Sequence, residues 1–307
     1  MKVLLSGGAG FIGRYVAEQL LRDDIGVIIF DHRSPGFASV SSERLKGAEY
    51  YIGDIRDEVA VTETMAHVDG FIHLAGVLGT QETIGNPKPA VMTNIVGGLN
   101  MLEAAAQYDI SGVNIAVGNH LENNPYSISK STVERLASMY RKERGVQVSS
   151  VRALNAYGPR QSVASPYGSS RVRKIMPSFI MRALHNHAIE VYGDGAQIMD
   201  MIYVEDVADF LVDTLMHTME HGAFEETIEA GTGRKTTVLE IANTVLSSVG
   251  SMSEVKFLPM RPGETPGAIV VADTNIAKRL LYPNGKGLVS LETGVKRTVA
   301  YYKGLIH

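Results

Sequence analysis

A glycine-rich turn near the start of the chain constrains the fold more than any other feature. An apolar run of Val3, Leu4 and Leu5 leads into residues 6–13, which carry several glycines, and an amphipathic helical pattern follows. Glycine lets the backbone approach a pyrophosphate, and the free N–H groups and dipole of a helix N-terminus favour its charge. The stretch predicts a dinucleotide site. The plainer alternative is a turn that only packs a helix on a strand. The expected cofactor contacts here are Gly7, Gly10, Phe11, Ile12 and Gly13.

A second apolar run, residues 27–30, ends in Asp31, about 20 residues after the turn. An acid at this place binds the adenosine ribose hydroxyls and repels a 2′-phosphate, so Asp31 favours NAD. His32 and Arg33 follow. Arg33 is the argument for NADP, because a guanidinium can hold a 2′-phosphate, or else it is a solvated loop charge.

Apolar strand-like runs alternate with helical patterns through the first half of the chain. This alternation predicts an α/β fold with a parallel sheet covered on both faces. Strands are expected at residues 49–53, 68–74 and 113–117. Helices are expected at residues 89–107, from 126 onward, and at 174–187 and 291–302, and residues 238–245 are expected to pack within the smaller lobe.

Tyr126 and Lys130 stand four residues apart at the predicted start of a helix, so both side chains share one face. A free phenol titrates near pH 10. A lysine ammonium and a cationic nicotinamide beside it would lower that pKa, so that Tyr126 takes a proton from a hydroxyl while hydride leaves the same carbon. By itself such a pair is also common by chance on an exposed helix face.

Gly7-x-x-Gly10-x-x-Gly13 together with Tyr126-x-x-x-Lys130 resembles the short-chain dehydrogenase/reductase superfamily. Residues 1 to about 300 resemble its extended branch, the nucleotide-sugar epimerases and dehydratases, and are similar to UDP-glucose 4-epimerases. The resemblance implies a Rossmann-type doubly wound parallel sheet with a smaller C-terminal substrate-binding lobe. The NAD-binding domain would span residues 1–155 plus parts of 190–235. The substrate lobe would span about 156–190 and 236–307.

The resemblance also implies roles for further residues. Asp54 and Ile55 would hold adenine, although Asp54 is equally read as a helix N-cap. Further cofactor contacts would be Leu74, Ala75, Gly76, Asn94, Tyr126 and Lys130. The substrate contacts would be Thr80, Asn119, His120, Asn155, Tyr192, Gln197, Arg261 and Glu264. His73, in an apolar strand, is expected to be a core histidine, and Asp200 a structural acid.

The chain departs from the family pattern in two places. After the fifth predicted strand the family has a serine or threonine that bonds the reacting oxygen, but here Asn119 and His120 stand in a short loop, and Thr80 is the other substitute. The same loop lacks the acid pair of the 4,6-dehydratases and keeps Glu122 alone. Met199 stands where the family has an arginine on the diphosphate.

Composition narrows the classes of partner and compartment. The 307-residue chain has a net charge of -4, no long basic run and no cysteine, which argues against nucleic acid as the main partner and excludes disulfides and cysteine metal sites. We expect no metal site, no signal peptide, no membrane span and a cytoplasmic location. A homodimer is expected through a four-helix seam made by the helices near residues 89–107 and after 126.

The predicted activity is that of an NAD-dependent nucleotide-diphosphate-sugar 4-epimerase that oxidises C4 transiently and retains its cofactor. UDP-glucose, UDP-N-acetylglucosamine and their uronic relatives are the expected substrates. Dehydration, decarboxylation and 4-keto reduction are alternatives in the same class. A catalytically weak NAD-binding sensor or scaffold is an alternative from another class.

Overall fold

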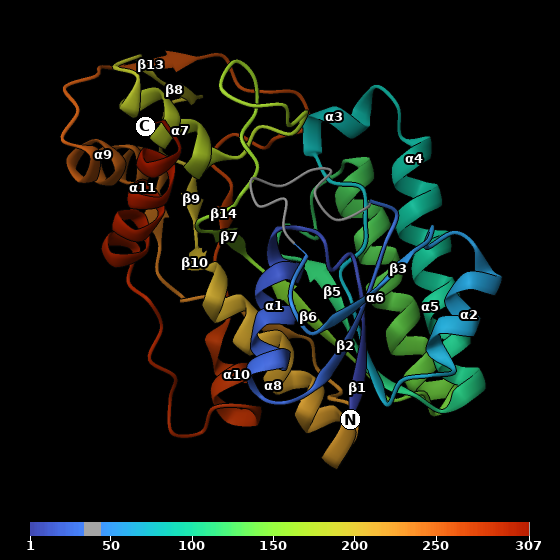
Figure 1. Ribbon diagram of the computed structural model, residues 1–307. Coiled ribbons are helices and arrows are strands. Elements are labelled where there is room, and N and C mark those ends of the chain that lie inside the picture. The colour runs from blue at the N-terminus through green and yellow to red at the C-terminus, as the bar shows by residue number, and fades with distance from the viewer. Residues whose placement is uncertain (34–43, 307) are drawn as a thin grey trace.

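The computed structural model describes residues 1–33 and 44–306. Its central sheet has seven parallel strands in the order β11-β6-β5-β4-β1-β2-β3 (Figure 1). In chain order these strands are β1 (Lys2–Ser6), β2 (Gly26–Asp31), β3 (Ala48–Ile52), β4 (Gly70–His73), β5 (Ser111–Val117), β6 (Val148–Ala153) and β11 (Ile228–Ala230). The chain runs outward from β1 to β3 and then returns to β4 on the other side of β1. This reversal opens a crevice at the carboxyl ends of β1 and β4, and the predicted Rossmann-type sheet is confirmed.

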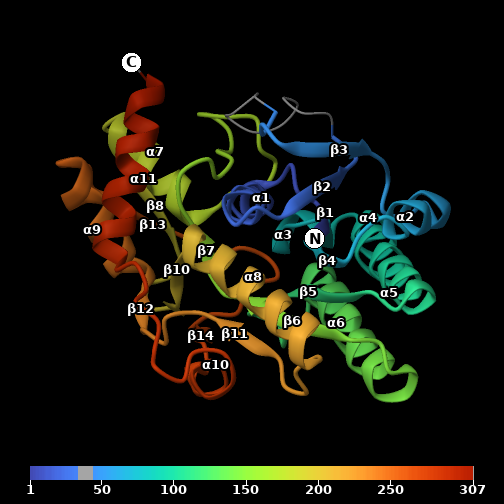
Figure 2. The ribbon, with the colours of Figure 1, turned by 60° about the horizontal axis from the view of Figure 1, so that its bottom comes forward.

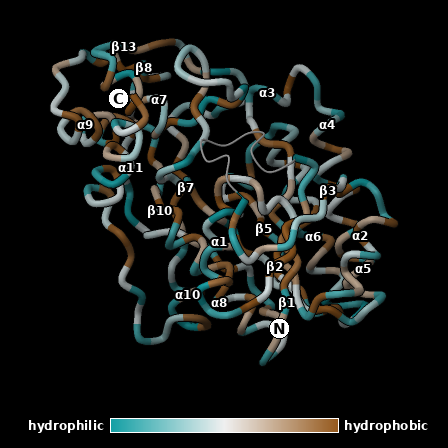
Figure 3. The backbone as a smooth tube through the Cα atoms, in the orientation of Figure 1, coloured by the Kyte–Doolittle hydropathy of each residue, from teal (hydrophilic) through white to brown (hydrophobic). Residues whose placement is uncertain are grey.

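Helices cover both faces of the sheet (Figure 2). On one face lie α1 (Phe11–Arg22) and α8 (Val204–His221), and on the other lie α2 (Glu58–Met65), α5 (Gly97–Tyr108) and α6 (Pro125–Arg144). Val3 and Leu5 enter the first core and Leu4 enters the second. Strands buried on both faces read as continuous apolar runs, and brown segments accordingly lie along β1 and β2 (Figure 3).

The helix predicted over residues 89–107 is not one regular helix. It consists of α4 (Lys88–Ala90), a wide π-helical turn η1 (Val91–Val96) and α5. Within η1, the Asn94 carboxamide accepts a bond from the Val77 N–H at 2.7 Å and donates to the Val77 carbonyl at 3.1 Å. Such turns are frequent at functional sites. Since these bonds reach across to another loop, the periodicity of the helix could not reveal them.

The second half of the chain builds a separate core with Tyr157, Phe179, Ile241 and Val295 at its centre. Its strands are β7 (Asn155–Tyr157), β8 (Ile189–Tyr192), β9 (Ile198–Met199), β10 (Met201–Tyr203), β12 (Thr236–Thr237), β13 (Val255–Leu258) and β14 (Ile269–Val270). Its helices are α7 (Ile175–Leu184), α9 (Val238–Val249) and α11 (Leu291–Ile306), while α10 (Thr274–Leu280) packs on the first core. In residues 1–33 and 44–306, no helix combines the length and the apolar character that a membrane span requires.

Candidate active site

A cavity of about 710 Å³ lies at the carboxyl ends of the central strands and extends to the smaller core. It brings together residues from the glycine turn, from α6 and from the second half of the chain. All predicted cofactor contacts line it except Asn94, and all predicted substrate contacts line it except His120. The sequence therefore located the walls of one pocket from segments that lie far apart along the chain.

The glycine turn has the geometry that a pyrophosphate requires. Gly7 adopts φ +74° and its N–H bonds to the Phe30 carbonyl at 2.8 Å. A Cβ on Gly13 would lie 2.5 Å from the Gly7 carbonyl oxygen, so only glycine fits there. Gly10 caps α1 without any side-chain hydrogen bond, which leaves the first N–H groups of the helix directed at the cavity. A negatively charged ligand is the partner these groups favour.

Asp31 ends β2 inside this region and is almost fully buried. One of its carboxylate oxygens accepts the Ala9 N–H at 3.1 Å, which ties it to the glycine turn. Arg33 folds back on Asp31 through Nε and Nη2, at 3.1 and 3.2 Å. In the free protein, Arg33 therefore neutralises Asp31, the predicted ribose acceptor. Arg33 is the same residue whose charge favoured NADP in the sequence.

Asp54 lines the cavity but does not cap a helix. Arg56 binds the Asp54 carboxylate, and this hydrogen bond lowers the pKa of Asp54 to about 2. The N-cap of α2 is Asp57, which accepts the N–H groups of Val59 and Ala60. The N-cap interpretation of Asp54 was thus wrong, because the helix begins three residues later than that interpretation needs.

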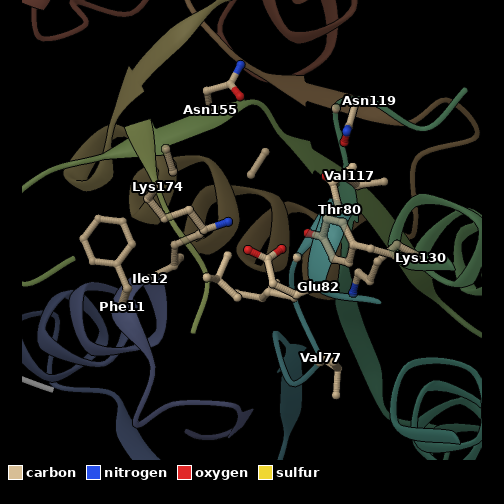
Figure 4. Close-up of a pocket in the computed structure, with 18 of the residues that line it drawn as sticks. Phe11, Ile12, Val77, Thr80, Glu82, Val117, Asn119, Lys130, Asn155 and Lys174 are labelled. Atoms are coloured by element: carbon tan, nitrogen blue, oxygen red, sulfur yellow. The ribbon is translucent and has the colours of Figure 1, made fainter. Parts of the chain in front are cut away.

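Tyr126 and Lys130, in the first turns of α6, both line the cavity. Figure 4 shows the Lys130 side chain there. The helix starts here because Asn124 accepts the Ser127 N–H at 2.9 Å and Pro125 occupies the first helical position. Burial lowers the pKa of Lys130 to about 8, against an opposing effect of the Glu134 carboxylate. Burial also raises the pKa of Tyr126 to about 12. The expected lowering of the Tyr126 pKa is absent in the protein alone, since desolvation of the phenolate dominates.

The loop after β5 places Asn119 in the cavity wall and turns His120 away from it. The His120 ring contacts the Gly118 carbonyl at 3.2 Å. The Asn119 amide donates to the Glu122 carboxylate at 2.6 Å, and Asn124 donates to the same oxygen at 3.1 Å. Of the predicted substitutes for the missing hydroxyl, Asn119 and Thr80 reach the cavity. Glu122 reaches it as well, although the sequence alone made it a lone and unpromising acid.

Asn94 does not line the cavity and instead holds together two segments that do. Besides Val77, its amide nitrogen donates to the Ser129 hydroxyl at 2.8 Å, which joins the loop after β4 to α6. His73 is a buried core residue as expected, with Nδ1 2.7 Å from the Ser6 hydroxyl, and burial lowers its pKa to about 3. Asp200 is structural as expected, since its carboxylate accepts the N–H groups of Thr232, Gly233 and Ala272.

The far end of the cavity is built around Tyr192. The Arg261 guanidinium lies 4.9 Å from the centre of the Tyr192 ring and forms an ion pair with Glu264. Arg173 donates to the Tyr192 hydroxyl at 2.9 Å and to Glu190 at 2.8 Å. Gln197 donates to the Tyr192 carbonyl. An aromatic ring with two guanidinium groups suits a planar base and a phosphate.

Sequence reasoning missed several charged residues of the cavity, among them Lys174 and Glu82. Lys174, just before α7, and Glu82, in α3 (Thr80–Ile84), point toward each other across the cavity (Figure 4). Burial lowers the pKa of Lys174, and the Glu82 charge opposes this effect. The sequence does contain a signal for Lys174, because Arg171, Arg173 and Lys174 form a basic run in an irregular loop. No sequence pattern marks Glu82, and only the tertiary structure shows that it reaches the cavity.

Comparison with known proteins places the chain in a family. The model of the NAD dependent epimerase/dehydratase family matches residues 3–231. A putative UDP-glucose 4-epimerase of Methanocaldococcus jannaschii is 29% identical over 98% of this chain and 98% of its own. UDP-glucuronic acid decarboxylase 1 of Danio rerio is 27% identical over 98% of this chain and 72% of its own.

Solved structures show the same relationship over the whole chain. The UDP-glucose 4-epimerase of Thermotoga maritima, with UDP-glucose, superposes with a TM-score of 0.85 at 28% identity, covering 100% of both chains. The UDP-glucose 4-epimerase of Thermus thermophilus, in complex with NAD, gives 0.82 at 26% identity and 99% of both chains. With the glycine turn, the Tyr126–Lys130 pair and the matching sheet, this chain belongs to the NAD dependent epimerase/dehydratase family.

Proposed function

We propose that this protein is an NAD-dependent 4-epimerase of a nucleotide-diphosphate sugar, which oxidises C4 transiently and keeps its cofactor. The observation that carries the proposal is that Tyr126 and Lys130 line one cavity together with the glycine turn and the basic residues Arg261 and Lys174. A sugar nucleotide with its phosphates at the basic end directs its sugar toward Tyr126.

The residues present fit NAD. A side chain at Gly7 or Gly13 would collide with the backbone, and the open end of α1 faces the same space. Gly10, Phe11 and Ile12 would hold the pyrophosphate, Asp31 the adenosine ribose, and Asp54 and Ile55 the adenine. When bound, NAD supplies the acceptor and donor of hydride. His32, Leu74, Ala75 and Gly76 complete the proposed cofactor wall.

The chain's own residues handle the proton. Tyr126 takes the proton of the C4 hydroxyl and returns it after the sugar has turned. The buried Lys130 ammonium stabilises the phenolate and so opposes the effect of burial on Tyr126. Thr80 and Asn119 supply hydrogen bonds to the reacting oxygen in place of the missing serine.

The diphosphate would be held by Asn155, Arg261 and Lys174, with Lys174 supplying the positive charge that Met199 lacks. Tyr192 and Gln197 would receive the base and Glu264 the ribose diol. By similarity to relatives that act on UDP-sugars, a UDP-sugar is the proposed substrate.

We also propose the division into a cofactor domain (1–155 plus parts of 190–235) and a substrate lobe, a homodimer through α5 and α6, and a cytoplasmic location.

The decisive experiment incubates the purified protein and its Tyr126→Phe variant with UDP-, dTDP- and GDP-sugars plus NAD⁺, separates the products and follows NADH absorbance. An epimer formed without net NADH, and absent with Tyr126→Phe, supports the proposal. A product that has lost water or CO₂ replaces it with dehydratase or decarboxylase activity. Tight NAD binding without turnover of any sugar leaves a sensor or scaffold.

A further inference from the structure

Two carboxylates, those of Glu82 and Glu122, line the cavity that also holds Tyr126 and the basic end. Glu82 follows Thr80 by two residues at the start of α3, and its carboxylate points into the middle of the cavity (Figure 4). Glu122 lines the same wall, with its carboxylate held by the amides of Asn119 and Asn124 at 2.6 and 3.1 Å. Both acids lie beside the proposed hydrogen-bond donors of the sugar, Thr80 and Asn119.

Neither acid has a cation within ion-pair distance in the described part of the chain. The guanidinium groups of the cavity are committed elsewhere: Arg33 to Asp31, Arg56 to Asp54, Arg173 to Glu190 and Arg261 to Glu264. Lys174 faces Glu82 across the cavity without forming an ion pair within 4.0 Å in residues 1–33 and 44–306. The Nε of Arg261 is buried and lacks a hydrogen-bond partner among these residues, so a polar ligand is expected at this point.

Binding of a diphosphate changes this charge balance. The phosphates would pair with Lys174 and Arg261, and Glu82 would lose the compensating charge that now faces it. The negative charge of Glu264 also lies near Glu122. The sugar would therefore lie beside Glu82 and Glu122, which have no cationic partner among the described residues. Glu122 is half-buried and Glu82 is exposed at the cavity wall, so the Glu122 charge is the less screened of the two.

We propose that Glu82 and Glu122 determine sugar specificity, so that the site accepts a neutral hexose and excludes a hexuronate. The inference rests on the proposed function and selects among its substrates. Carboxylates accept hydrogen bonds from sugar hydroxyls, whereas the carboxylate of a uronic acid offers no donor and repels both residues. UDP-glucose and UDP-glucuronate differ at C6 alone, so a comparison of the two isolates this charge.

The test measures dissociation constants for UDP-glucose and UDP-glucuronate by calorimetry. It uses the NAD-loaded Tyr126→Phe protein, in which turnover is blocked. We expect UDP-glucose to bind about 100-fold more tightly, because one unit charge at contact distance is worth this much in a partly desolvated site. The same measurement is then made with Glu82→Gln and Glu122→Gln introduced together, which keeps the size of each side chain and removes its charge. We expect the ratio of the two dissociation constants to shrink about tenfold, through tighter binding of UDP-glucuronate.

Glu63→Gln is the matched control, since Glu63 is exposed on α2 and outside the cavity lining. It should leave the ratio unchanged. Equal affinity for the two sugar nucleotides, or a ratio unaffected by the paired glutamines while UDP-glucose still binds, overturns the inference. Failure of every sugar nucleotide to bind, with NAD bound, instead sinks the proposed function, so the two failures are distinguishable.

Discussion

Arg33 clamps Asp31 through two side-chain bonds, from Nε and Nη2 to the two carboxylate oxygens at 3.1 and 3.2 Å. The same carboxylate accepts the Ala9 N–H of the glycine turn. The residue proposed to bind the ribose and the residue that offsets its charge thus form one unit, and we expect cofactor selectivity to follow from their balance.

We expect the protein to bind NAD⁺ more tightly than NADP⁺, and Arg33→Ala to widen this preference about tenfold. Without the guanidinium, the Asp31 carboxylate repels a 2′-phosphate uncompensated. Asp31→Asn should narrow the preference. Titration of cofactor-free protein with both dinucleotides measures the two ratios. An unchanged ratio in Arg33→Ala would show that the clamp has no part in selectivity.

Gly13→Ala should abolish NAD binding and lower the free energy of unfolding by about 1–3 kcal/mol, because overpacking forces the backbone to move. The new Cβ would lie 2.5 Å from the Gly7 oxygen and 2.6 Å from the Gly8 Cα. Gly304→Ala, in α11 with nothing within 4 Å of its Cβ, is the control and should stabilise slightly. Denaturant unfolding and NAD titration check both variants.

Lys130→Met should abolish turnover and yet stabilise the cofactor-free protein at pH 7 by about 3 kcal/mol. Burial lowers the folded-state pKa of Lys130 to about 8, from 10.5. Below pH 8 the fold carries a buried charge at a cost. Between about pH 8 and 10.5 Lys130 is protonated in the unfolded chain and deprotonated in the folded one. The free energy of unfolding of the wild type therefore rises with pH in this range and approaches that of the variant. Urea melts of both proteins across this range should converge. A constant difference would contradict the assigned pKa.

Discrimination against UDP-glucuronate should weaken as the pH falls from 8 toward 5. Burial raises the pKa of Glu122, with the Glu264 charge adding to the effect and the Asn119 and Asn124 amides opposing it. Protonation of Glu122 therefore begins at a higher pH than for a free glutamate and removes part of the repulsion. Calorimetry of the Tyr126→Phe protein at several pH values measures this trend, and Glu122→Gln should flatten it.

Met139→Glu should convert a homodimer into a monomer. Ile128, Arg135 and Met139 are exposed along one stripe of α6, spaced by seven and four residues, and both apolar members are at least 40% exposed. A buried carboxylate at a helix seam is costly. Light scattering after gel filtration gives the mass of both proteins, and Met252→Glu, a fully exposed change elsewhere, is the control. A wild-type monomer would refute the proposed seam.

Much of the site was predictable because it depends on local chemistry. Gly7 and Gly13 serve a turn that tolerates no side chain, Asp31 ends a buried strand, and Tyr126 and Lys130 share a helix face by their spacing alone. Each of these signals is contained within a few residues of chain. For this reason the residues predicted to bind the cofactor, except Asn94, line one cavity.

The substrate half depended on contacts between distant segments. Glu82 faces Lys174 across 92 positions of sequence, and the role of Asn94 rests on bonds to Val77 and Ser129. His120 and Asn119 are neighbours in the same loop, yet the Asn119 side chain faces the cavity and the His120 side chain does not. No periodicity records which side chain a folded loop turns inward.

The sequence by itself determined the doubly wound sheet, and it predicted the dinucleotide site and the Tyr126–Lys130 pair, because strand, turn and helix propensities act over short distances. Only the tertiary structure decided the charge balance around the proposed sugar site, the neutralisation of Asp31 by Arg33 and the raised pKa of Tyr126. Burial and electrostatic interaction depend on what packs around a group in space, and a linear order of residues does not contain that information.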